Sequence, residues 1–155
     1  MCLIFVHCYR IIKIILQFIE KRVIIIMSRE VDNVKDKYIK KLEKCGVDYR
    51  EGLARFMDEE ELFDGLLMNF LTENSFDEAK RCIDSGDLKG AEYAVHAMKS
   101  VTGTLSMNKL FKLCSRTMDA IRDCDTDVMR TTFSQAYKNY LEIAKLLRTI
   151  RDASR

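Results

Sequence analysis

Apolar residues recur every three or four positions along most of this chain, which is the spacing of amphipathic α-helices. The pattern predicts helices over about residues 32–45, 58–71, 75–84, 87–105, 108–123 and 126–152, with a short helical turn within 46–57. Short links make consecutive helices turn back on one another. The sequence therefore predicts an all-α fold, an antiparallel four-helix bundle with an additional N-terminal helix.

Helix ends are marked by residues that favour capping. Gly46 is expected to end the first helix, and the turn before residue 87 contains a second glycine. The side chains expected to cap helix N-termini are Asp58, Ser75 (in a capping box with Glu78), Asp87, and Ser106 or Asn108. On the helix begun by Asp87, the stripe expected to be buried consists of Leu88, Ala91, Val95, Met98, Thr102 and Leu105.

Composition supports long helices and excludes several classes of site. The chain has no proline, no tryptophan and six glycines. Its net charge of +2 arises in the first 27 residues, which carry four basic residues and one acidic; the remaining 22 basic and 23 acidic residues give −1. No basic patch indicates nucleic-acid binding. The six cysteines form no C-x-x-C pair, so we expect no zinc site and free thiols in a reducing cytosol.

Residues 1–26 are mostly apolar, so a membrane segment has to be considered. Within the first 19 residues, eleven Leu, Ile, Phe and Val side chains favour insertion, at about −0.5 kcal/mol each, while Arg10 and Lys13 near the centre oppose it at about +3 kcal/mol each. The two contributions nearly cancel. We expect translation to start at Met27, with an interfacial anchor as the alternative, and a membrane-spanning role is not favoured.

His96 is the only histidine outside this N-terminal segment. It lies about 100° around the helix from Val95, off the predicted buried stripe, so burial does not explain its presence. Lys99 shares its face one turn ahead, where an ammonium group can neutralise a phosphoryl oxygen. Ser100 and Gly103 on that face are small, which leaves room for another protein to approach the imidazole. Gly103 also costs about 1 kcal/mol inside a helix relative to alanine, which calls for a reason.

The spacing of His96, Lys99 and Gly103 resembles the signature of the histidine phosphotransfer (HPt) domain family, in which lysine follows the histidine at +3 and glycine at +7. The resemblance covers about residues 46–150, which would form the bundle, with 27–45 as the additional N-terminal helix. The chain departs from the family pattern at Ser100, where the family often has glycine. Serine is small, so we expect this change to be tolerated.

The resemblance implies a phosphoryl relay. His96 would attack an aspartyl phosphate on a receiver domain, hold the group as a phosphoramidate, and give it to a second aspartate. Lys99, Ser100 and Gly103 would support the phosphate. Residues bordering this face, which we expect to contact a partner, are Lys89, Glu92, Tyr93 and Thr104. For Glu92, a solvated surface residue is the simpler interpretation. The receiver would supply Mg²⁺ and the catalytic groups, so this chain needs no cofactor of its own and is a carrier, not an enzyme.

The partners that follow are a response-regulator receiver domain and a hybrid sensor histidine kinase, with the carrier acting as a cytoplasmic monomer. No Gly-rich ATP lid or P-loop pattern indicates autokinase activity. The alternative is an α-helical adaptor that binds receiver domains and is not itself phosphorylated. Retention of both His96 and Lys99 favours the relay.

Overall fold

The computed structural model describes residues 35–153, and within that range all regular secondary structure is helical. The chain divides into two compact units, Met1–Tyr38 and Ile39–Arg155. Of the first unit, only 35–38 are described, and they are helical. The expectations for residues 1–26 and for the start of the first helix lie outside the described residues. The all-α fold class is confirmed for the part described.

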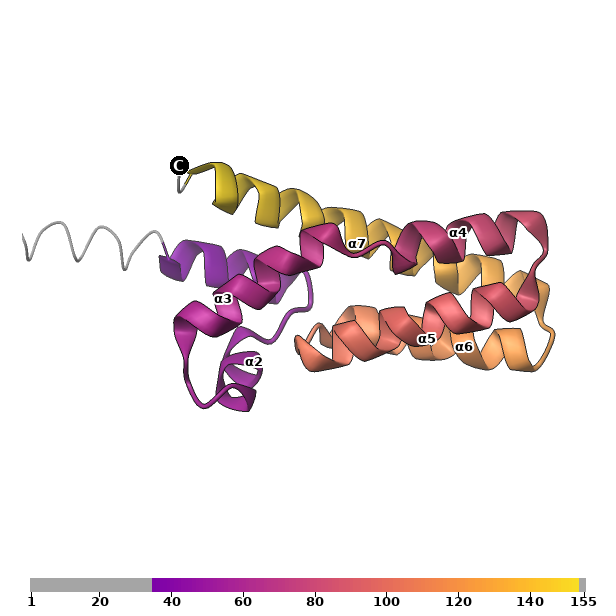
Figure 1. Ribbon diagram of the computed structural model, residues 1–155, viewed down its shortest axis with the longest axis horizontal. Helices are drawn as coiled ribbons and strands as arrows, with labels where there is room; N and C mark the ends of the chain where they lie inside the picture. The colour runs from indigo at the N-terminus through magenta and orange to yellow at the C-terminus, as the bar shows by residue number, and fades with distance from the viewer. Residues whose placement is uncertain (1–34, 154–155) are drawn as a thin grey trace, which may run out of the picture. The chain divides into compact units, whose positions relative to one another are not determined.

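The second unit begins with helical residues 39–44. The elements that follow are α2 (Tyr49–Arg55), α3 (Glu60–Asn69), the 3₁₀ turn η1 (Phe70–Thr72), α4 (Ser75–Ser85), α5 (Leu88–Thr104), α6 (Asn108–Arg122) and α7 (Thr126–Ala153) (Figure 1). No helix among these residues is long and apolar enough to cross a bilayer.

Helices α4 to α7 pack in chain order, each against the next, and α4 also contacts α7. The links between them are two or three residues long, so neighbouring helices run antiparallel, as Figure 1 shows. The long helix α7 extends beyond α4 and is contacted there by α3 and η1. This packing agrees with the predicted bundle, but the part N-terminal to it holds α2 and α3 as well as the first helix.

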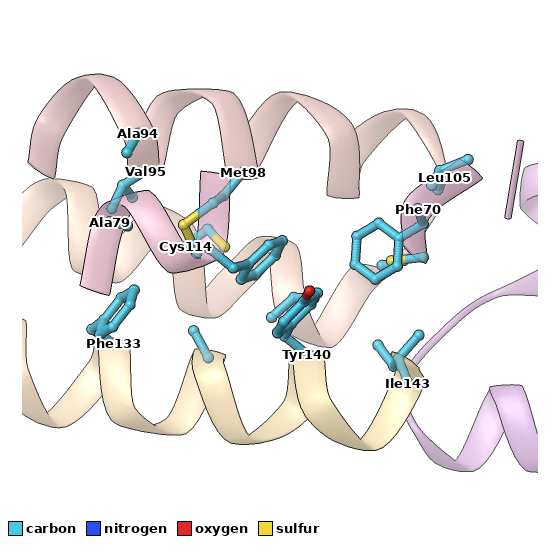
Figure 2. Packing of buried hydrophobic residues seen from close by; sticks show 14 of the residues in the cluster. Phe70, Ala79, Ala94, Val95, Met98, Leu105, Cys114, Phe133, Tyr140 and Ile143 are labelled. Carbon is cyan, nitrogen blue, oxygen red and sulfur yellow. The ribbon is translucent and has the colours of Figure 1, made fainter. Parts of the chain in front are cut away.

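Aromatic rings join α4 to α7 inside the core. Phe76 stacks on Tyr140 with ring centroids 4.1 Å apart, and Phe70 meets both rings edge-on at 5.8 and 5.6 Å. Figure 2 shows Val95 and Met98 of α5 directed into the same interior, opposite side chains of α7. Full burial of one such side chain contributes about 1.5–3 kcal/mol, so these contacts hold α5 in place against its neighbours.

Two glycine turns and one cap lie where the sequence predicts them. Gly46 (φ 88°) ends the first helix and Gly86 (φ 77°) ends α4, both in the left-handed region that glycine occupies without strain. The Asp87 carboxylate accepts a hydrogen bond from the Gly90 N–H at 2.9 Å and caps α5. The predicted stripe on this helix is buried, with Leu88 half-buried at its start.

The other predicted caps are wrong. Asp58 lies in a left-handed turn (φ 60°), and Glu59 takes the cap position without a side-chain bond. Ser75 is the first helical residue of α4, and Asn74 takes the cap position. The buried Ser75 hydroxyl has no partner, and no capping box with Glu78 forms.

Met107 occupies the cap position of α6, where the sequence predicted Ser106 or Asn108. The hydroxyl of Ser106 (φ 51°) is buried without a partner, and the Asn108 amide donates instead to Glu51 at 3.0 Å.

Candidate functional site

His96 stands exposed on α5, on the side away from the buried stripe. Behind it, Ala91, Val95 and Met98 are fully buried against the neighbouring helices. A helix anchored along one whole side holds the residues on its other side in fixed positions. The imidazole is therefore open to solvent on a well-held support, as the sequence predicts.

A shallow groove of about 220 Å³ has His96 in its lining. It is lined by Lys89, Glu92, Tyr93 and His96 of α5 and by Met118 and Arg122 of α6. Tyr93 is 83% exposed, which is unusual for so large a ring. The structure thus brings three of the four predicted partner contacts together around the histidine.

Arg122 is a member of this groove that sequence reasoning missed. Its Nε donates a hydrogen bond to Oε1 of Glu92 at 2.9 Å, and the two side chains remain 59% and 43% exposed. Glu92 is therefore an ion-pair partner of α6, which the interpretation as a solvated surface residue did not include. The pair places a guanidinium group beside the turn of α5 that presents His96.

Lys99 lies outside the groove lining and contacts a different side chain. Its Nζ sits 5.5 Å from the ring centroid of Phe111 on α6, within the range of a cation–π contact. The side chain is half-buried. Lys99 follows His96 by one turn along α5, but its ammonium group is directed to Phe111 of α6, whereas Arg122 lines the groove with His96.

Phe111 also explains Gly103. A Cβ added at Gly103 would come within 3.1 and 3.2 Å of the Phe111 ring carbons Cε2 and Cδ2, closer than such contacts ordinarily are. The missing side chain therefore makes room for a ring of the same chain, at a position where the sequence suggested room for a partner. The extra cost of glycine in a helix has an intramolecular reason.

The remaining predicted residues lie further along α5. Ser100 is exposed one turn after His96, and the Thr104 hydroxyl donates to the Ser100 carbonyl oxygen at 3.0 Å. Neither residue lines the groove around the imidazole. The two groups of predicted residues therefore form two neighbouring surfaces of one helix.

The groove suits an anionic group. Lys89 and Arg122 line it and Lys99 lies one turn beyond, whereas Glu92 is the acidic side chain that lines it. A phosphoryl group carries close to two negative charges and three acceptor oxygens, which guanidinium and ammonium groups bind well. In the described part of the chain, no group of three or more His, Cys, Asp or Glu side chains lies close enough to hold a metal ion.

A second, roomier groove of about 840 Å³ lies between residues 43–48, α6 and α7. Its lining mixes basic side chains such as Lys109 and Arg116 with acidic ones such as Glu142. Its lining contains no histidine, cysteine or serine. The smaller groove is lined by His96, the residue that the sequence singles out, and is the better candidate site.

Comparisons of this chain with protein-family models, with curated proteins and with solved structures find no match.

Proposed function

We propose that this protein is a histidine phosphotransfer protein that carries a phosphoryl group on His96 between receiver-domain aspartates. The observation that supports this most is the exposed imidazole on a well-anchored helix, with Arg122 in its groove and Lys99 one turn away. A nucleophile that must meet a phosphoryl group held by another protein needs exposure, fixed direction and nearby positive charge.

The transfer itself uses few groups. The unprotonated ring nitrogen of His96 attacks the phosphorus of an aspartyl phosphate. A P–N bond forms while the bond between phosphorus and the carboxyl oxygen breaks, and the aspartate leaves as a carboxylate. The other ring nitrogen keeps its proton. The reverse step, with a second aspartate as nucleophile, restores the imidazole. Mg²⁺ and the remaining catalytic groups belong to the receiver in this proposal.

The exposed groove rim supplies a surface for the partner. Tyr93 projects beside the histidine and offers a large ring to a docking protein, and such aromatic residues often dominate interfaces. The partners in this proposal are the receiver domains of a hybrid sensor kinase and of a response regulator, met by a monomeric carrier in the cytoplasm.

Transfer of label from a phosphorylated receiver domain to the full chain, in the presence of Mg²⁺, tests the proposal. The wild-type chain and His7→Gln, which removes the other histidine of the chain, should both take up an acid-labile, alkali-stable label. His96→Gln should take up none while keeping its helical circular dichroism. Absence of label from a panel of receivers that bind the folded wild type would favour the adaptor function.

A further inference from the structure

Arg122 is the cation that α6 contributes to the histidine groove, and its guanidinium is already engaged there. Its Nε–H points to the Glu92 carboxylate at 2.9 Å. Both side chains are about half exposed, so water screens the pair and the contact is weak. A stronger anion in the same groove can therefore take the guanidinium away from Glu92.

A phosphoryl group on His96 would be such an anion. Glu92 and His96 are one helical turn apart and line the same groove, together with Arg122. A phosphoryl group offers three oxygens and close to two charges, whereas the carboxylate offers two oxygens and one charge. The planar guanidinium can bind two phosphoryl oxygens at once, which strengthens the contact further.

We propose that Arg122 exchanges partners during the relay, pairing with Glu92 when His96 is free and with the phosphoryl group when His96 is loaded. The inference rests on the proposed function, since it concerns the phosphorylated state of His96. Glu92 is then a positioning residue that competes with the phosphoryl group for one guanidinium. This competition sets how long the phosphohistidine lasts.

The direction of the effect follows from the charge on the phosphoryl oxygens. Hydrolysis breaks the P–N bond through a loose transition state, in which the imidazole leaves with a proton as water adds to phosphorus. A guanidinium on the oxygens stabilises the loaded state and slows this loss. Removing Arg122 should therefore shorten the lifetime of the phosphohistidine, and removing the competing charge of Glu92 should lengthen it.

The test loads the full chain with phosphoramidate, a small donor whose P–N bond breaks to release ammonia as His96 takes the phosphoryl group, so no receiver is needed. Phosphorus NMR then gives the half-life of the phosphohistidine. We expect Arg122→Ala to shorten it and Glu92→Gln to lengthen it, each by about threefold, the size of an exposed charge contact. Arg116→Ala on the same helix and Glu142→Gln on α7 are controls that should leave it unchanged.

The double variant identifies the exchange. Glu92→Gln should have no effect on the half-life in the Arg122→Ala background, and the Arg122 Nε–H resonance should move on loading of the wild type. An equal effect of Glu92→Gln in both backgrounds, or an unchanged half-life in Arg122→Ala, would overturn the inference alone. Failure of phosphoramidate to load His96 in the folded wild type would instead count against the proposed function, and the inference would fall with it.

Discussion

Phe111 determines the surroundings of two predicted phosphate-site residues. Its ring lies under the Lys99 ammonium group and fills the space beside Gly103. Through these contacts α6 supplies neighbours to α5 beyond His96 that the motif does not include. At the scale of single residues, the site therefore depends on side chains that the motif does not contain.

Lys99→Ala separates the contact of this lysine with Phe111 from its proposed role at the phosphoryl group. We expect the free energy of unfolding to fall by about 0.5–1 kcal/mol through loss of the cation–π contact at a partly exposed site. Phosphotransfer from a receiver should slow by about tenfold if the charge contributes about 1.4 kcal/mol in the transition state. Urea titration and single-turnover transfer measure the two effects. Lys99→Arg should keep most of both, and an unchanged transfer rate in Lys99→Ala would exclude the phosphate role.

At the scale of the elements, α5 is the helix whose position matters most, and its start is fixed by one carboxylate. Asp87→Ala removes the bond to the Gly90 N–H and should cost about 1 kcal/mol of stability. Ser75→Ala is the matched control, because the buried Ser75 hydroxyl has no partner to lose. Thermal unfolding followed by circular dichroism compares them. An equal loss in both variants would contradict the assignment of caps.

The helices of this chain were easier to predict from the sequence than their caps. The helices and the buried stripe of α5 were predictable because a period of 3.6 residues is written directly into the order of apolar positions. The caps were harder, because Asp58 and Ser106 have left-handed backbone and the cap positions fall on the residues that follow them, Glu59 and Met107. No glycine occupies either position to mark the left-handed turn.

Arg122 was missed for a different reason. It is far from His96 in sequence, and a motif search along one helix cannot reach it. The link between α5 and α6 is short, however, so residues equally distant from that link lie opposite one another in the antiparallel pair. Counting outward from Ser106 brings Glu92 and Arg122 to nearly the same level, which is a signal that sequence analysis can use.

At the scale of the whole described unit, hydrogen bonds between distant helices add to the apolar core. The Tyr137 hydroxyl on α7 donates to Oδ1 of Asp77 on α4 at 2.7 Å. This bond to a carboxylate, with some burial, raises the pKa of Tyr137 to about 12. Helix α4 is thereby tied to α7 at the surface as well as through Phe76 and Tyr140 in the interior.

The sign of the pH dependence follows from that raised pKa. The hydrogen bond stabilises the fold fully below pH 10, the ordinary pKa of tyrosine, and its contribution is lost as pH rises toward about 12. Tyr137→Phe should therefore cost about 1 kcal/mol or less at pH 7, since the site is partly exposed, and less still at pH 11. Urea titrations at the two pH values measure the difference. A larger cost at pH 11 would contradict it.

The proposed relay requires that His96 both accept a phosphoryl group and give it up, so the most direct measurement follows one label through three proteins. A phosphorylated receiver, the full chain and a second, unphosphorylated receiver are mixed with Mg²⁺ and sampled over time. We predict that label appears transiently on His96 and then accumulates on the second receiver, and that His96→Gln abolishes both steps. Label that reaches the second receiver equally well with His96→Gln, or never leaves the first, would contradict the relay.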